Sequence, residues 1–412
     1  MVSILPFFYL PLVYLLSAKD WFLRYSVTYI KIMIKPMNKS LEIVFDCQEQ
    51  SLTFLEAQLQ QAIQQGAQGV SILLASNYPH TEEALNGCLK RLSVPVSGAV
   101  FPELIYGNQY YDTAAIALLW FHEIKIHTFL GVSNLDSELY QRQTPIDGRA
   151  EHMTSLVFSN TKTRAAEAAL DALYFRNGQG SHYAGAGAGY SESSRRPSII
   201  TNDGLVSDAM QITRLPYTQA TRVGHGWSIL SGPHLVTESE ENRVATLDYQ
   251  AIKPYFQQII QTHYSKDLSA LSFEEMMSLF PVGIQPYDED MIVRDLLAYE
   301  AGEIQFIGDI PEFSNIYILT GEPESLLKYV EQHSAQFEAN AQTDPSLSII
   351  FSCVGRRRHM GNKSDQELNL LATSLQKSQQ LIGVSSLGEI ASNNVGLARL
   401  HSMSLVVSSL SL

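Results

Sequence analysis

The feature of this sequence that most constrains its fold is that the end of the chain repeats the beginning. Each copy contains, in order, a strand-like run, a helical stretch, a second strand that ends in a glycine turn, and a third strand. The first copy occupies residues 70–119 and the second occupies residues 347–407. Such a duplication predicts two lobes built alike, and paired lobes commonly bind a ligand in the cleft between them.

Composition and periodicity indicate the broad class of the chain. Its 412 residues are 45% hydrophobic and 17% charged, which is typical of a globular protein with ordinary cores. Strands alternate with helices in both copies, and apolar residues at helical spacing predict a further helix over 52–64. We therefore expect an α+β protein of two related α/β lobes, with mixed sheets flanked by helices.

Two segments between the copies predict turns. Residues 178–197 are rich in glycine, alanine and serine, and this composition predicts a flexible turn and linker. Asn202-Asp-Gly204 lies between two apolar runs and predicts a tight hairpin, because these residues are favoured in two-residue turns.

Charge and cysteine content exclude several classes of function. The net charge is -14, and the densest basic run, Arg356 to Arg358, is too short to form a phosphate-binding face, so nucleic acid is not an expected partner. The cysteines Cys47, Cys88 and Cys353 lack metal-ligand spacing and fit a reduced, cytoplasmic compartment. We expect neither a metal nor a cofactor.

The N-terminal segment 1–36 has two interpretations. Residues 4–16 form an apolar run at the lower length limit of a membrane span, and the lysines and arginines that follow it would leave the main body in the cytoplasm. Alternatively, the segment is an extension upstream of the true start, and Met37 opens the folded protein. Both interpretations place the main body in the cytoplasm, and a membrane is a partner only if the anchor is real.

Short motifs over residues 41–412 carry a family resemblance. They are Val236-Thr237, Leu247-Asp248, Pro254-Tyr255, Val293-Arg294-Asp295, Phe351-Ser-Cys353, Gly355-Arg356, Glu367, Leu381-Ile-Gly383, Gly388-Glu-Ile390 and Leu400-His401. In this order they resemble the FIST family, with a FIST N domain at 37–220 and a FIST C domain at 221–412. One departure is Gly98-Ala-Val-Phe-Pro-Glu103, where the family typically has a turn that contains cysteine.

The resemblance implies a sensory role in signal transduction. FIST proteins are proposed to bind small ligands such as amino acids and to feed a signalling output. Some eukaryotic relatives carry an F-box and act in ubiquitin ligases. Neither a fused signalling domain nor an F-box is recognisable in this sequence, so we expect an unidentified downstream signalling protein as partner.

The family motifs supply candidate ligand-binding residues. Arg356 and Arg357 would grip an anionic group, since a guanidinium binds a carboxylate through two hydrogen bonds. Glu389 would receive a cationic group, and an amino acid suits that pair of charges. Gly383 and Gly388 would allow the backbone to approach closely, because they have no Cβ atom. We expect the site in the cleft between the two lobes and expect it to be non-catalytic.

Two further candidates, Cys353 and His401, leave the chemistry open. Cys353 ends an apolar strand, where a cysteine is either an inert buried residue or a nucleophile with a lowered thiol pKa. An enzyme would pair Cys353 with His401 or His359 as base. A third interpretation is a protein-interaction scaffold like the F-box-linked relatives, which predicts an exposed apolar patch.

Overall fold

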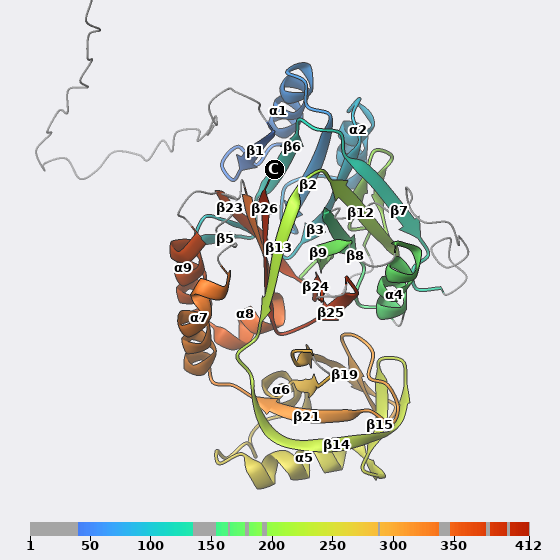
Figure 1. The fold of residues 1–412 in the computed structure, drawn as a ribbon, viewed down its shortest axis with the longest axis vertical. Coiled ribbons are helices and arrows are strands. Elements are labelled where there is room, and N and C mark those ends of the chain that lie inside the picture. The colour runs from blue at the N-terminus through green and yellow to red at the C-terminus, as the bar shows by residue number, and fades with distance from the viewer. Residues whose placement is uncertain are drawn as a thin grey trace, which may run out of the picture. The chain divides into compact units, whose positions relative to one another are not determined.

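Three six-stranded mixed sheets with one common strand order dominate the fold in this computed structural model (Figure 1). The structure describes residues 40–134, 154–163, 165–177, 181–191, 196–286, 289–337, 347–375, 380–393 and 396–411. The N-terminal segment 1–36, with its two interpretations, lies outside these described residues.

The first sheet contains most strands of the first copy. In spatial order its strands are β1 (Leu41–Asp46), β6 (Ala115–Trp120), β2 (Gly69–Ala75), β3 (Val96–Phe101), β10 (Ile199–Thr201) and β11 (Gly204–Val206). β2 and β3 are parallel, and every other neighbouring pair is antiparallel. β10 and β11 form the hairpin predicted at Asn202-Asp-Gly204.

The second and third sheets repeat this order and these directions. The second contains β7 (Lys125–Leu130), β12 (Ala209–Leu215), β8 (Thr154–Ser159), β9 (His182–Gly187), β24 (Glu389–Ser392) and β25 (Ala398–His401). The third contains β13 (Thr218–Gly224), β26 (Leu405–Ser411), β22 (Leu347–Cys353), β23 (Gln380–Ser386), β4 (Glu103–Tyr106) and β5 (Gln109–Tyr111). The parallel pairs are β8 with β9 and β22 with β23.

Each sheet takes its last two strands from a hairpin that belongs to another part of the chain. The β4–β5 hairpin leaves the first sheet's segment and joins the third sheet, and β10–β11 leaves the second sheet's segment and joins the first. The β24–β25 hairpin leaves the third sheet's segment and joins the second, which closes the cycle. The three sheets are therefore interlocked by main-chain hydrogen bonds between distant segments.

The observed architecture confirms the α+β class with mixed sheets and shows the repeated unit a third time, over residues 125–215. The expectation of a flexible linker at 178–197 was wrong for residues 182–187, which form the buried strand β9. A Cβ atom on Gly185 would lie 1.8 Å from the Val157 carbonyl oxygen on the neighbouring strand β8. Glycine is required at position 185 because the backbones of β8 and β9 pack closely, and not because the chain is flexible there.

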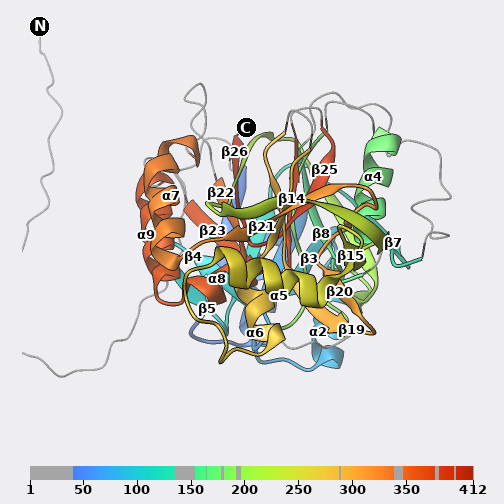
Figure 2. The ribbon, with the colours of Figure 1, turned by 90° about the horizontal axis from the view of Figure 1, so that it is seen from below.

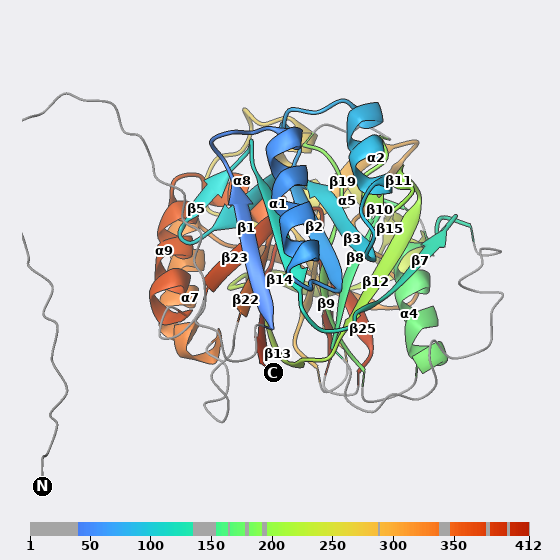
Figure 3. The ribbon, with the colours of Figure 1, turned by 90° about the horizontal axis from the view of Figure 1, so that it is seen from above.

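Helices cover the outer faces of the sheets. α1 (Leu52–Gln64) and α2 (Glu82–Lys90) pack on the first sheet (Figure 3). Thr81 caps α2, with its Oγ1 accepting from the Ala84 N–H at 3.1 Å. α4 (Ala166–Asn177) packs on the second sheet. α7 (Pro323–Phe337) and α9 (Lys363–Leu375) pack on the third.

The inner faces of the three sheets share one hydrophobic core. Trp120 and Phe101 enter it from the first sheet, Phe158 from the second and Phe351 from the third, and each of these side chains is at most 2% exposed. Because one core serves all three sheets, the N-terminal and C-terminal halves of the chain depend on each other for burial of apolar surface.

A fourth sheet is inserted between β13 and α7. Its elements are β14 (Ser228–Glu240), β15 (Arg243–Leu247), β16 (Gln250–Ala251), α5 (Ile252–His263), α6 (Phe273–Leu279), β17 (Val282–Ile284), β18 (Ile292–Arg294), β19 (Leu296–Glu300), β20 (Glu303–Phe306) and β21 (Asn315–Thr320). Figure 2 shows α5 lying along β14 and β21, and the helices and this sheet enclose a separate core that includes Phe256 and Phe306.

Candidate functional site

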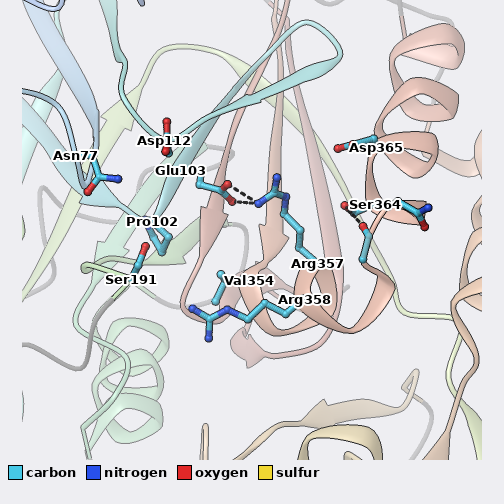
Figure 4. Close-up of a pocket in the computed structure, with 12 residues that line it drawn as sticks. Asn77, Pro102, Glu103, Asp112, Ser191, Val354, Arg357, Arg358, Ser364 and Asp365 are labelled. Carbon is cyan, nitrogen blue, oxygen red and sulfur yellow. Dashed lines mark hydrogen bonds and ion pairs between the residues drawn. The ribbon is translucent and has the colours of Figure 1, made fainter.

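A pocket of about 510 Å³ lies where the carboxyl ends of the parallel strands β2, β3 and β22 meet (Figure 4). Its lining from the first half of the chain is Asn77, Pro102, Glu103, Asp112 and Ser191. Its lining from the second half is Val354, Arg357, Arg358, Gly361, Asn362, Ser364 and Asp365. Ligands of open α/β sheets commonly bind at this end of the strands, so the position itself favours a binding site.

Arg357 is held in the pocket by the exchanged β4–β5 hairpin. Its Nη1 donates to both carboxylate oxygens of Glu103 at the start of β4, and its Cζ lies 3.9 Å from the centre of the Tyr110 ring on β5 (Figure 4). Ser385 also donates to Glu103, with an Oγ to Oε2 distance of 2.9 Å. The Arg357 side chain is therefore fixed by an ion pair and a cation–π contact.

Arg358 is the cation of the pocket that stays open to solvent. Arg358 lines the pocket and is exposed, and its guanidinium donates no hydrogen bond to any described residue. Burial raises the pKa of the Asp295 carboxyl to about 6, although a backbone hydrogen bond and the charges of Lys162 and Arg358 act to lower it. Asp112 and Asp365, both exposed, supply negative charge to the same pocket.

Arg356 does not line this pocket. It is 0% exposed, and it pairs with the buried Glu367 on α9, with an Nη2 to Oε1 distance of 2.7 Å. Its Nη1 donates to the His225 carbonyl. Both Arg356 and Arg357 lie in helix α8 (Val354–Met360), where successive side chains diverge by about 100° around the axis, so only one of them reaches the pocket.

Glu389 is also outside the lining, fully buried at the start of β24. Ser386 Oγ donates to its Oε1 at 2.5 Å, and Ser404 Oγ donates to its Oε2 at 2.6 Å. Burial raises the pKa of Glu389 to about 8 in spite of these hydrogen bonds and of Arg356. Glu389 therefore lies apart from this pocket, and its expected contact with a ligand's cationic group stays a prediction.

The buried Glu389 is expected to make stability depend on pH. Between about pH 5 and pH 8 the folded state keeps a proton on Glu389 that the unfolded state releases, so the contribution of Glu389 to the free energy of unfolding falls as pH rises, by up to about 1.4 kcal/mol per unit. Glu389→Gln should flatten this slope in urea unfolding experiments across the window, whereas Glu83→Gln on the exposed face of α2 should leave it unchanged. Equal slopes for wild type and Glu389→Gln would contradict the assignment.

Cys353 and His401 are positioned as structural residues. Cys353 is 1% exposed, and burial, together with the nearby Glu389 and Asp295, raises its thiol pKa well above the ordinary value. Burial lowers the pKa of His401 to about 3, with Arg294 adding to the effect. Among the described residues, no hydrogen bond connects the Cys353 thiol with an imidazole. This geometry favours the inert interpretation of Cys353, since a reactive thiol needs a lowered pKa.

Gly383 and Gly388 are explained by the backbone conformation and packing at their positions. A Cβ atom on Gly383 would lie 2.2 Å from the Ile350 carbonyl oxygen of β22, and Gly388 has a φ of +100°. Gly98 and Gly185 hold the position of Gly383 in the other two parallel pairs. None of these glycines lines the pocket, so the close approach that they permit is between strands.

Sequence reasoning missed Arg358, Asp112 and Asp365 as pocket residues. The signal for Glu103 was present, since it ends the segment that departs from the family's usual turn, and Pro102 and Glu103 both line the pocket. Asp112 follows the β4–β5 hairpin and reaches the pocket only because that hairpin joins the third sheet. No local pattern in the sequence indicates that the β4–β5 hairpin joins the third sheet.

The fold and the pocket define an α+β protein whose two halves share one core and together line one ligand-sized pocket. The chain belongs to the FIST family: the FIST N domain matches residues 70–250 and the FIST C domain matches residues 255–392. This confirms the family resemblance. FIST domains are sensory domains in signal transduction. No curated protein matches the chain.

Metal-ligand clusters and membrane-spanning helices are both absent from the described residues. No group of three or more histidine, cysteine or carboxylate side chains in the described part is arranged to hold a metal ion. No helix in that part has the length and apolar character needed to cross a membrane. The domain boundary expected between residues 220 and 221 stays a prediction.

Proposed function

We propose that this protein is a cytoplasmic sensory module that binds a small ligand with both an anionic and a cationic group, such as an amino acid, without catalysing a reaction on it. The site is the pocket between the FIST N and FIST C segments, and the signal passes to a separate downstream protein. The observation that carries the proposal is the exposed guanidinium of Arg358 in a pocket that also contains the carboxylates of Asp112 and Asp365.

The size and charge of the pocket support this ligand class. About 510 Å³ falls within the range of pockets that take small molecules. A ligand carboxylate would bind the fork of Arg358 through two hydrogen bonds, and an ammonium group would bind Asp112 or Asp365.

A thermal-shift screen of the full chain tests the proposal. Amino acids, small carboxylates and nucleotides form the panel, and a true ligand at about 100 times its Kd should add roughly 2.7 kcal/mol to the free energy of unfolding. A shift confined to zwitterionic compounds supports the amino-acid proposal. A flat response to the whole panel contradicts it.

Arg358→Ala is expected to weaken binding of the ligand found in that screen by about tenfold to a hundredfold. A charged hydrogen-bonded contact contributes about 1.5–3 kcal/mol, and this variant removes both guanidinium bonds. Isothermal titration calorimetry would give the Kd. Arg222→Ala is the matched control, because Arg222 is exposed on β13 and does not line the pocket. Equal loss in both variants would contradict the placement of the site.

The scaffold alternative has one observation in its favour. Tyr249 and Phe313 in the fourth sheet's loops are 81% and 69% exposed, and such aromatic side chains are enriched at protein interfaces. A protein that co-purifies with the wild type but not with Tyr249→Ser, together with a flat ligand screen, would favour this alternative.

A further inference from the structure

A serine, a histidine and an aspartate form a hydrogen-bonded row in the fourth sheet, away from the residues that line the pocket. Ser231 Oγ lies 3.1 Å from His234 Nε2, and His234 Nδ1 lies 2.9 Å from Asp248 Oδ2. Ser231 and His234 belong to β14, and Asp248 follows β15. The same atoms in the same order make up the nucleophile, base and orienting carboxylate of serine hydrolases, which recur on unrelated folds.

The Asp248 carboxylate is fixed and ionised. Its Oδ1 accepts from the Leu235 N–H at 2.9 Å, and its Oδ2 also accepts from the Tyr255 hydroxyl at 2.9 Å. Burial opposes ionisation, but the hydrogen bonds from Leu235, His234 and Tyr255 outweigh it and lower the pKa of Asp248. An ionised carboxylate only accepts hydrogen bonds, so His234 Nδ1 must carry the proton that it shares with Asp248.

This proton position determines the role of Ser231. When the imidazole is neutral with its proton on Nδ1, its Nε2 is an acceptor, and the Ser231 hydroxyl is then the donor in the 3.1 Å contact. The histidine is therefore oriented to receive the serine proton. The Tyr255 ring meets the His234 ring edge-on, with centroids 5.7 Å apart, and helps to hold it in place.

The backbone brings Ser231 to the surface. The pairing of β14 with β21 is irregular on both sides of Ser231, and such bulges are over-represented next to active sites. Gly232 and Pro233, which follow Ser231, are exposed, while the His234 side chain is only 11% exposed. The nucleophile candidate is thus reachable from solvent, and its base is shielded behind it.

We propose that Ser231 is the nucleophile of a second, hydrolytic site, with His234 as general base and Asp248 as the residue that positions the imidazole. Ser231 Oγ forms a bond to the carbonyl carbon of an ester, and His234 takes the hydroxyl proton. The alcohol leaves with that proton, and the acyl group stays on Ser231. Water then attacks the acyl-serine, so that the products are a carboxylic acid and the regenerated serine.

The surroundings of Ser231 restrict the substrate class to small carboxylic esters. The site is open at Gly232 and Pro233, so a large acyl group would gain little burial there. Ile229, two positions before Ser231 on β14, is 54% exposed, so an apolar side chain is open to solvent on the same strand. This inference is independent of the sensory pocket, because the two sites share no residue.

Labelling with diisopropyl fluorophosphate tests the proposal on the full chain. Peptide mass spectrometry should find the phosphoryl adduct on Ser231, and Ser231→Ala should lose both the adduct and the hydrolysis of p-nitrophenyl acetate. Ser228→Ala is the matched control, since Ser228 is exposed at the start of the same strand and makes no contact with His234. An unlabelled Ser231, or equal ester hydrolysis by wild type and Ser231→Ala, would overturn the proposal.

His234→Gln separates an activated serine from a merely exposed one. Glutamine keeps hydrogen-bonding capacity and side-chain bulk but does not act as a general base, so the rate of labelling at Ser231 should fall by about 10²- to 10⁴-fold. Circular dichroism would verify that both variants remain folded. A labelling rate that is unchanged in His234→Gln would overturn the assignment, and Ser231→Ala, which removes one hydroxyl, provides the readout if His234→Gln does not fold.

Discussion

Arg356→Ala is expected to lower the free energy of unfolding by about 3–5 kcal/mol. The substitution leaves the Glu367 carboxylate buried, with side-chain exposure of 2%, and without the guanidinium that lies 2.7 Å away. It also removes the donor to the His225 carbonyl. Urea unfolding followed by circular dichroism would measure the loss.

A double variant distinguishes a lost charge pair from a lost contact. Arg356→Met with Glu367→Leu removes both charges and fills a similar volume, and such replacements of buried pairs are often neutral. We expect it to be considerably more stable than Arg356→Ala. If the double variant is as unstable as the single one, the penalty comes from packing and not from an unpaired carboxylate.

Gly383→Ala is expected to destabilise the protein by about 3 kcal/mol or more, at the upper end of overpacking effects. The new Cβ would lie 2.2 Å from the Ile350 carbonyl oxygen, which is main chain and does not rotate away. β23 is paired on both sides, with β22 and with β4, so relief would require a shift of the whole sheet. Thermal unfolding would show a lowered Tm.

A glycine in a helix provides the control for this substitution. Gly87 lies in α2, where a Cβ atom would meet only the Arg91 side chain at an ordinary 3.5 Å. Gly87→Ala should therefore be neutral or stabilise by about 0.5–1 kcal/mol, since alanine favours the helix. If Gly383→Ala behaves like Gly87→Ala, the strands are not packed as closely as the fold requires.

The interlocked sheets suggest how a ligand signal could reach the rest of the molecule. The pocket's Arg357 is bound to Glu103 on β4, and β4 pairs with β23 in the third sheet. A ligand bound at Arg358 under the proposed function would lie in the same pocket as this ion pair, and thus next to the hairpin that joins two sheets. Because one closely packed core serves all three sheets, a displacement of this hairpin is expected to displace its neighbours in the core as well.

Local elements of the fold could be predicted from the sequence because their signals are local. The helix expected over 52–64 coincides with α1, and the strand-like run expected at the start of the second copy, from residue 347, coincides with β22. Apolar residues at helical spacing indicate the helix, and a short run of mainly apolar residues indicates the strand. Both signals lie within a few neighbouring residues. The Asn202-Asp-Gly204 hairpin was predictable for the same reason.

The third copy of the unit could not be recognised by the same signals. Its strand β9 consists largely of glycine and alanine, which are also the residues of flexible linkers. A glycine can serve backbone flexibility or the close approach of two strands, and its neighbours in space decide which. The neighbour of Gly185 is the Val157 carbonyl, 28 positions earlier in the chain.

The sequence by itself determined the family, the α+β class and most of the helices and strands, because motif order and periodicity are properties of the chain alone. Only the tertiary structure decided which charges reach the pocket. Arg356 and Arg357 are neighbours in sequence, but one is paired with Glu367 in the interior and the other lines the pocket. Likewise, Asp248 reaches His234 only because β15 pairs with β14 in a register that brings Leu247 opposite Val236, and that register with its bulges is set by packing in the tertiary structure.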